Sequence, residues 1–273
     1  MTRSISGTLT FLATQSAAPV YRASVGGAEA RLDISGEYED LEVEVMNARL
    51  NDETFALDKH GFELVTQRTS VSDLFNVEER ESTYERECCD LVIAATGAGR
   101  THCFDHTLRS SDPERRAEKR VREPTSVIHN DYTPRSAPQR VRDMMGDEAD
   151  ALLKQPFAIV NVWRPLQTVR TFPLALCDAR TVVDDALVAA ERRAKDRIGE
   201  LFMVRNRPEQ RWYYFPDMTH AEALLIKTFD SRDDGRARWC VHTALVSNAF
   251  PDDAPPRESI ETRVFAFFDR VGD

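Results

Sequence analysis

The stretch Thr125-Ser126-Val127-Ile128-His129-Asn130-Asp131 is a short apolar segment that ends in a histidine and an aspartate two residues apart. Its β-branched residues favour a strand. Residues i and i+2 of a strand project from the same face, so the imidazole of His129 and the carboxylate of Asp131 can reach one cation. An H-x-D pair alone is a weak signal, because it occurs by chance in many chains. The surrounding sequence therefore has to decide the fold and the site.

Most of the chain around this stretch is predicted to form strands. Short β segments are expected across residues 7–65, and beyond residue 100 strands are predicted at 101–108, 125–129, 157–163, 172–177, 200–205, 211–215, 222–229, 238–246 and 259–268. Helices are predicted at 81–96, 137–153 and 184–197, the last from acidic residues at its start and basic residues at its end. Because strands and helices do not alternate, we expect a mainly β fold with flanking helices, either an antiparallel barrel or a double-sheet jelly roll.

Composition excludes several classes of partner. Lys plus Arg is 36 and Asp plus Glu is 46, so the net charge of −10 disfavours nucleic acid and anionic membranes as partners. The five cysteines are scattered without a C-x-x-C motif, as is typical of the reducing cytoplasm. There is neither a secretory signal nor an apolar run of membrane-spanning length, so we expect a cytoplasmic protein. The sequence leaves a homodimer open.

A distant histidine completes a metal-binding pattern. His242 lies in a strand-like segment 111 residues after Asp131. Two histidines and one carboxylate form the facial triad of non-haem Fe(II) oxygenases, which leaves coordination positions open for a cosubstrate and O₂. The alternative for His242 is a hydrogen-bonded histidine of the core.

Arg257 follows His242 by fifteen residues and shares a strand face with Ser259. A guanidinium can hold a carboxylate through two parallel charge-assisted hydrogen bonds, and a hydroxyl can add a third. This pair would therefore suit the distal carboxylate of 2-oxoglutarate, whose keto-acid end chelates iron. The alternative for Arg257 is a surface ion pair with Asp252 or Asp253.

Two residues of the predicted strand 157–163 are candidates for the pocket. Asn161 and Trp163 share a strand face, so the amide could hydrogen-bond the cosubstrate and the indole could form a pocket wall. Packing in the core is the alternative for Trp163.

Three further residues complete the set of candidates for the substrate pocket. Tyr132 directly follows Asp131 and is expected to border the iron. Arg164 would either anchor a substrate carboxylate or form an outward ion pair. His106 is expected to line the pocket or to form a hydrogen bond there, rather than to bind metal. The charged run 112–122 is either a solvated loop or a mobile lid.

Seven motifs resemble, as a set and in this order, a hydroxylase/desaturase family of small-molecule tailoring enzymes. They are FDHTLR (104–109), VIHNDYT (127–133), IVNVWRP (159–165), LCDAR (176–180), WYY (212–214), LLIKTFDS (224–231) and PRESI (256–260). The family includes the cephamycin methoxylation protein, gibberellin-desaturase-like enzymes and fungal meroterpenoid oxygenases. The resemblance runs from about residue 100 to 268. One departure is Cys240-Val241 before the distal histidine, where relatives are expected to have a proline or a polar residue.

The resemblance implies a double-stranded β-helix that uses Fe(II), 2-oxoglutarate and O₂. It assigns the iron ligands to His129, Asp131 and His242, and the cosubstrate grip to Arg257 and Ser259. We therefore expect one domain, 1–273, in which N-terminal strands and a helix of residues 1–98 pack on the barrel. Residues 99–273 would form the double-stranded β-helix core with inserted helices.

The expected function is oxidation of a small natural-product or amino-acid-derived molecule. The enzyme would hydroxylate, desaturate or oxidatively cyclise this substrate and release succinate and CO₂. One alternative is an iron oxidase of the same fold that uses no 2-oxoglutarate, in which Arg257 would bind the substrate. A second alternative is a non-catalytic jelly-roll binding module with structural histidines.

Overall fold

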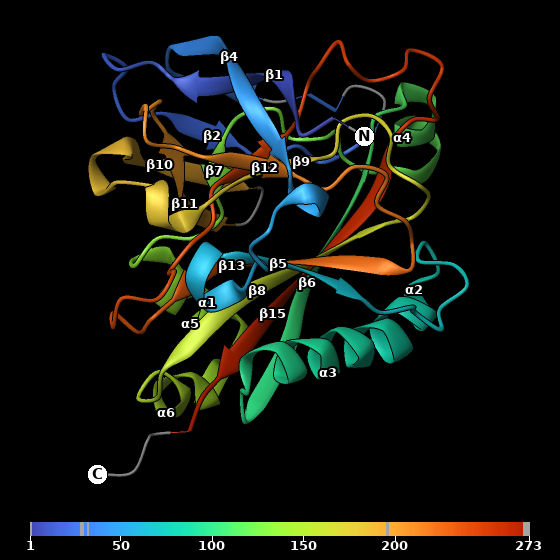
Figure 1. Ribbon diagram of the computed structural model, residues 1–273. Coiled ribbons are helices and arrows are strands. Elements are labelled where there is room, and N and C mark those ends of the chain that lie inside the picture. Colours follow the sequence, from blue (N-terminus) through green and yellow to red (C-terminus); the bar gives the residue numbers. More distant parts are fainter. Residues whose placement is uncertain (1, 28–29, 32, 195–196, 270–273) are drawn as a thin grey trace.

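Two stacked β-sheets dominate the computed structural model, which describes residues 2–27, 30–31, 33–194 and 197–269 (Figure 1). The smaller sheet has five strands, all antiparallel to their neighbours. In spatial order they are β5 (Phe62–Thr66), β13 (Glu222–Asp230), β8 (Phe157–Pro165), β15 (Glu258–Phe267) and β6 (Arg100–Ser110). β8, β13 and β15 are buried almost throughout, because both faces of this sheet are covered, and their sequences are accordingly apolar along their length.

The larger sheet has ten strands in the described part of the chain. In spatial order they are β1 (Ser4–Leu12), β4 (Tyr38–Asn47), β12 (Trp212–Tyr214), β9 (Leu174–Cys177), β14 (His242–Ala244), β7 (His129–Asn130), β11 (Arg197–Val204), β10 (Leu187–Ala194), β2 (Val20–Arg22) and β3 (Asp33–Ile34). The pairs β4–β12 and β2–β10 are parallel, and the others are antiparallel. The sheet is therefore mixed.

The core between the sheets brings distant segments together. Trp163 and Leu224 of the smaller sheet share one apolar cluster with Leu174 and Tyr213 of the larger sheet. Two sheets packed face to face in this way make a jelly roll, which confirms the predicted fold class.

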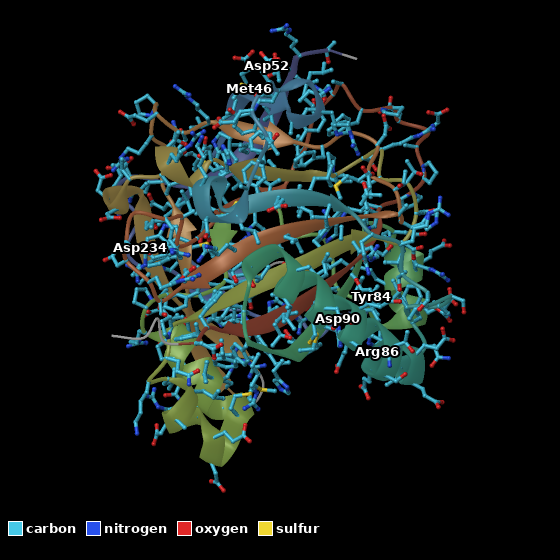
Figure 2. The ribbon with its side chains drawn as sticks, turned by 60° about the horizontal axis from the view of Figure 1, so that its bottom comes forward. Met46, Asp52, Tyr84, Arg86, Asp90 and Asp234 are labelled. Atoms are coloured by element: carbon cyan, nitrogen blue, oxygen red, sulfur yellow. The ribbon has the colours of Figure 1, made fainter. Side chains whose placement is uncertain are left out.

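Helices cover the outer surfaces of the smaller sheet. α3 (Glu85–Thr96) lies across its outer face, where Cys88 and Val92 pack against strand residues such as Val264 (Figure 2). α5 (Ser136–Met145) and α6 (Ala149–Leu152) pack near the end of the same sheet (Figure 1). The remaining helical segments are α1 (Leu57–His60), α2 (Val77–Glu79), α4 (Pro113–Lys119), the π-turn Arg80–Tyr84 and the 3₁₀ turns Ala48–Leu50, Gly146–Glu148, Ala179–Thr181 and Asp184–Ala186.

Two of the three predicted helices are present. The helix predicted at 81–96 is α3 with a π-turn before it, and Gly97 ends it with a φ of 70°. The helix predicted at 137–153 is divided into α5 and α6 at Gly146, whose φ is 53°. No helix in the described part of the chain is long and apolar enough to cross a membrane.

The helix predicted at 184–197 is wrong. Apart from a 3₁₀ turn at Asp184–Ala186, the segment forms β10, which pairs along its whole length with β11. Residues 195–196 lie outside the described residues. The charge bias at the ends of the segment contributes only about 0.3–1 kcal/mol to a helix, less than a full ladder of backbone pairs and the burial of Ala190.

Residues 1–98 contribute strands to both sheets. β1 and β4 form one end of the larger sheet, β2 and β3 form its other end, and β5 is an edge strand of the smaller sheet. The N-terminal strands therefore continue the sheets by backbone hydrogen bonding, in addition to packing on them.

Candidate metal centre

The centre of the larger sheet brings His129 and His242 side by side. β7 and β14 are neighbouring strands, and the two histidines are directly paired, with their ring centroids 4.7 Å apart. Asp131 follows β7, so its carboxylate points to the same side. One ligand atom from each of these three residues lies within 4.8 Å of the others. The structure thus brings together the three predicted ligands.

The backbone orients both imidazoles in the same way. Nδ1 of His129 lies 2.8 Å from the carbonyl oxygen of Val127, and Nδ1 of His242 lies 3.0 Å from that of Cys240. A carbonyl can only accept, so each Nδ1 donates and each Nε2 keeps its lone pair for the site. Burial, followed by the neighbouring His242, lowers the pKa of His129 to about 4. His129 is therefore neutral at pH 7, the form that binds a metal.

The carboxylate of Asp131 is held from one side only. Its Oδ2 accepts hydrogen bonds from Nδ2 of Asn161 at 2.8 Å and from Nε of Arg263 at 2.9 Å. Its Oδ1 lies 3.7 Å from Nε2 of His129. Burial opposes ionisation, but the guanidinium of Arg263, the two histidines and the amide of Asn161 together outweigh it and hold the pKa of Asp131 well below its ordinary value. Asp131 therefore presents an ionised, oriented oxygen beside the two imidazoles.

Asn161 has a different role from the predicted one. The same Nδ2 also donates to Oε1 of Glu261 at 2.7 Å, while Oδ1 accepts from the hydroxyl of Thr228 at 3.3 Å. Both amide hydrogens are thereby used. Contrary to the prediction, no amide donor is left for a cosubstrate, and Asn161 instead holds the carboxylates of Asp131 and Glu261.

Arg263 was missed by the sequence analysis. It lies on β15, where Nη2 donates to Glu261 at 3.0 Å and Nη1 donates to Asp105 at 2.9 Å, in addition to the bond from Nε to Asp131. The available signal was the spacing of Ser259, Glu261 and Arg263, which places three polar side chains on one face of β15.

Arg257 is buried just before β15, with 2% of its surface exposed. Nη1 donates to the carbonyl oxygen of Phe172 at 2.8 Å, Nε and Nη2 approach Oγ of Ser259 at 3.3 Å, and Cζ lies 5.2 Å from the ring centroid of Trp163. Burial, then repulsion from Arg109, lowers the pKa of Arg257 to about 9. Among the described residues no carboxylate forms an ion pair with Arg257, so the alternative pairing with Asp252 or Asp253 is not found.

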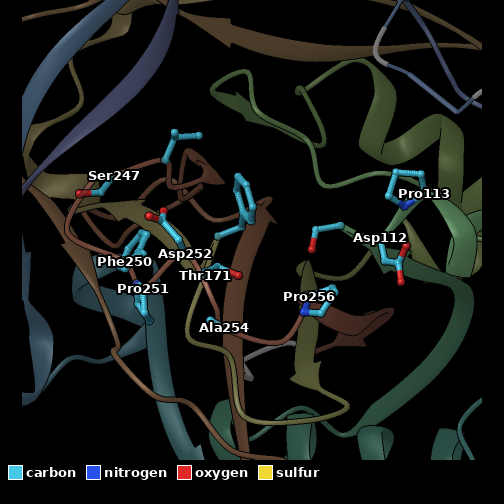
Figure 3. Close-up of a pocket in the computed structure, with 12 residues that line it drawn as sticks. Asp112, Pro113, Thr171, Ser247, Phe250, Pro251, Asp252, Ala254 and Pro256 are labelled. Atoms are coloured by element: carbon cyan, nitrogen blue, oxygen red, sulfur yellow. The ribbon is translucent and has the colours of Figure 1, made fainter.

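One small cavity connects the histidines with this arginine. His129, His242, Trp163 and Arg257 line a cavity of about 20 Å³ between the sheets. A larger cavity of about 390 Å³ is lined by Pro256, the residue before Arg257 (Figure 3). The site therefore combines a largely buried metal-ligand set, a cation and a nearby hollow.

Several known proteins match this chain over most of its length. Residues 9–267 match a family model described as an oxidoreductase/YMDC permease-like domain. The chain is 34% identical over 255 residues to the hydroxylase/desaturase efuI of Hormonema carpetanum, and the match covers 85% of each protein. It is 31% identical over 229 residues to the Fe(II)/2-oxoglutarate-dependent dioxygenase nvfI of Aspergillus novofumigatus, with 81% of each covered. The chain belongs to the hydroxylase/desaturase family.

A solved structure of an iron-dependent oxygenase has the same fold as this chain. A variant of the iron and alpha-ketoglutarate-dependent endoperoxidase NvfI superposes with a TM-score of 0.85 at 26% identity and covers 99% of both chains. The predicted resemblance and the predicted enzyme class, a non-haem Fe(II)/2-oxoglutarate-dependent dioxygenase, are thereby confirmed.

Three residues that were predicted to border the substrate pocket, Tyr132, Arg164 and His106, do not line the small cavity. Tyr132 is buried against Phe104, with ring centroids 6.4 Å apart. Arg164 donates to the carbonyl oxygens of Gln67 and His220, at 2.6 and 3.0 Å. It neighbours Trp163 along β8 and therefore projects from the opposite face of the sheet.

His106 also faces away from the metal ligands. Its ring nitrogens contact Glu85 at 2.9 Å and Thr262 at 2.8 Å, and Glu85 begins α3 on the outer face of the sheet. Arg164 and His106 are thus connected to the outer layer, while Trp163 lines the cavity as predicted. The helix α4 forms most of the charged run 112–122.

Proposed function

We propose that this chain is an Fe(II)/2-oxoglutarate-dependent oxygenase that hydroxylates, desaturates or oxidatively cyclises a small natural-product or amino-acid-derived molecule, with release of succinate and CO₂. One observation carries the proposal. The two histidines of the cluster His129, Asp131 and His242 line one cavity together with a buried Arg257, which forms no ion pair with a carboxylate among the described residues.

The residues present fit both groups. Two neutral imidazoles and one carboxylate form the ligand set typical of non-haem Fe(II). A buried guanidinium beside a hydroxyl is typical of a carboxylate-binding site, which suits the distal carboxylate of 2-oxoglutarate. When bound, iron and 2-oxoglutarate supply the oxidising chemistry, which no side chain of the protein can provide.

The protein contributes orientation and exclusion of water. The carbonyls of Val127 and Cys240 fix the ring orientation of the two histidines, and Asn161 and Arg263 fix one oxygen of Asp131. Arg257 is held in place by Phe172 and Ser259 before any ligand arrives. The surrounding apolar core keeps the cavity small, which strengthens these electrostatic contacts.

The relatives support the range of reactions rather than one product. They are named a hydroxylase/desaturase, a dioxygenase and an endoperoxidase. All three names describe oxidation of a small organic molecule. For this chain's own substrate we therefore propose hydroxylation, desaturation or oxidative cyclisation without choosing among them.

An anaerobic titration tests this function. Fe(II) followed by 2-oxoglutarate should produce the weak visible charge-transfer band of the chelate, and turnover should release succinate. His129→Ala should lose stoichiometric iron, whereas Arg193→Met, at an exposed residue of β10, should keep it. Iron retained in full by His129→Ala would contradict the ligand assignment. Oxidation without succinate would instead favour the oxidase that uses no 2-oxoglutarate.

We also propose a cytoplasmic location and a small-molecule substrate as the principal partner. All five cysteines are free thiols, which supports a reducing compartment. The acidic composition supports the absence of nucleic-acid and membrane partners.

A further inference from the structure

We propose that a second cavity, lined by three arginines, binds an anionic group of the substrate, either a carboxylate or a phosphate. The inference rests on the proposed function and adds a substrate class to it. The cavity measures about 490 Å³, and its charged lining is Arg122, Arg140 and Asp143 of α5, and Arg197 of β11, three cations against one carboxylate. Arg122 follows α4 and pairs with Arg109 of β6, so the arginines come from separate parts of the chain.

These arginines are poorly compensated in a protein with a net charge of −10. Within the described residues, Arg197 has one carboxylate in reach, that of Asp143 at 4.0 Å, while Arg122 and Arg140 form no ion pair. Nε of Arg140 is buried without a hydrogen-bond partner. Its guanidinium lies over the ring of Phe104, with Cζ 5.3 Å from the centroid. Several N–H donors therefore remain open around one hollow.

The cluster is electrostatically strained without an anion. Burial, then repulsion from Arg109 and Arg192, lowers the pKa of Arg122. Burial, then repulsion from Arg140, lowers the pKa of Arg197. Like charges held together destabilise the free protein, and an anion placed among them relieves this repulsion. Such a cost is typical of a ligand site rather than of a structural element.

Two series of contacts connect the arginine cavity with the metal centre, although the two cavities share no lining residue. The ring of Phe104 contacts both Arg140 and Tyr132, and Tyr132 directly follows Asp131. Arg122 pairs with Arg109, which lines the metal cavity. A molecule whose anionic group lies among these arginines therefore has to extend past these residues to reach the metal ligands, while Arg257 stays available for 2-oxoglutarate.

The cavity beside Arg257 has the opposite charge. It is lined by Asp112 and Asp252, neither of which forms an ion pair in the described part of the chain (Figure 3). Carboxylates at that position repel an anionic substrate. Of these two cavities, only the arginine-lined one suits an anion.

Calorimetric titration with three matched probes tests the proposal. Benzoate, phenyl phosphate and the neutral benzamide are added anaerobically to protein saturated with Fe(II) and 2-oxoglutarate. We expect benzoate or phenyl phosphate to bind at least about tenfold more tightly than benzamide, and the stronger of the two identifies the anion. Arg122→Met and Arg140→Met should each weaken that binding by about tenfold or more. The control Arg193→Met, in which an exposed arginine paired with Glu191 is lost, should leave it unchanged.

A second measurement locates the probe. The ring-proton lines of bound benzoate should broaden in protein loaded with paramagnetic Mn(II) but not in protein loaded with diamagnetic Zn(II). The proposal would be overturned if benzamide bound as tightly as the better of the two anions, or if Arg193→Met weakened that anion as much as Arg122→Met and Arg140→Met do. Absence of line broadening with Mn(II) would also overturn it.

The proposed function and this inference can fail separately. A missing chelate band in the wild type contradicts the proposed function, whereas the probe affinities can still be measured on the metal-free protein. Arg257→Met should weaken 2-oxoglutarate and leave the probe unaffected, the reverse of Arg140→Met.

Discussion

Two buried arginines lie on the same face of one segment, Arg263 within β15 and Arg257 directly before it. Arg263, within β15, donates to three carboxylates, those of Asp131, Glu261 and Asp105. Arg257, at the start of β15, donates to the carbonyl of Phe172 and the hydroxyl of Ser259. Both residues are at most 8% exposed.

The difference separates a structural charge from a ligand-binding charge. A buried ion is costly unless a counter-charge and hydrogen bonds compensate it. The protein itself compensates Arg263, which therefore belongs to the folded framework of the site. The hydrogen bonds of Arg257 go only to neutral acceptors, and Glu261 attracts it without forming an ion pair, so a bound anion has most to contribute there. The same residue type, at similar burial, thus has two roles set by its neighbours.

The largest effect is expected for Arg263→Met. The change leaves Asp131 and Glu261 buried without their cation, and breaking a buried pair in this way costs about 3–5 kcal/mol of unfolding free energy. Urea unfolding of the metal-free protein measures the loss, and iron binding should weaken with it. Arg263→Lys keeps the charge and should recover part of the stability. If Arg263→Met unfolds at the wild-type urea concentration, Arg263 is not the charge that supports Asp131.

Acid should reduce the stabilisation that comes from the ion pairs of Arg263 and should not change the contribution of Arg257. Burial opposes ionisation of Glu261 and Asp131, but the surrounding positive groups, with Arg263 the strongest of them, together lower the pKa of both. Groups with a depressed folded pKa stabilise the protein above their unfolded pKa of about 4, and this stability is lost as the pH falls below it. Each such carboxylate contributes a slope of up to about 1.4 kcal/mol per pH unit.

Unfolding curves between pH 6 and pH 2.5 measure that slope. Arg257→Met should keep the wild-type slope, and Arg263→Met should flatten it. Equal slopes of unfolding free energy against pH in the two variants would contradict the distinction between Arg263 and Arg257.

Arg257→Met should change ligand binding while leaving the fold intact. Loss of the charged fork should weaken 2-oxoglutarate by about one to two orders of magnitude, and Arg257→Lys should weaken it less. Because the buried cation has no carboxylate partner among the described residues, the unfolding free energy should stay the same or rise. Titration of the chelate band and urea unfolding measure the two quantities. Should the variant lose stability as Arg263→Met does, the distinction between the two arginines fails.

Asn161→Leu tests the neutral part of the Arg263 network. The variant removes a donor shared by Asp131 and Glu261, but leaves both carboxylates with Arg263. Groups that orient a metal ligand typically contribute about 10–100-fold to metal affinity, and we expect the lower end here. Calorimetric Fe(II) titration measures it, with 2-oxoglutarate affinity in the iron-saturated protein as the control. Selective loss of 2-oxoglutarate would restore the original assignment of Asn161 to the cosubstrate.

The smallest effect is expected for Ser259→Ala at the Arg257 end. Both of its contacts with the guanidinium are 3.3 Å long, so its loss should weaken 2-oxoglutarate only by about threefold to tenfold. Iron affinity should not change. A loss as large as that of Arg257→Met would mean that the hydroxyl, rather than the guanidinium, holds the cosubstrate.

The spacing of residues along the chain was enough to predict which side chains of a single strand segment share a face. The side-chain period of two placed His129 with Asp131 and Arg257 with Ser259, and it holds wherever a strand forms. The set of motifs along the chain indicated the family. Where the signal was an end-charge bias, as for residues 184–197, the prediction failed because strand pairing contributes more.

Only the tertiary structure decided which of these segments meet. His129 and His242 become neighbours through the pairing of β7 with β14, across more than a hundred residues. Asn161 and Arg263 join Asp131 because β8 and β15 stack against β7 from the opposite sheet. A side chain's partner is set by strand order and burial, both long-range properties that chain spacing does not encode. For the same reason the arginine cavity, assembled from a loop, a helix and a strand, has no counterpart in any single motif.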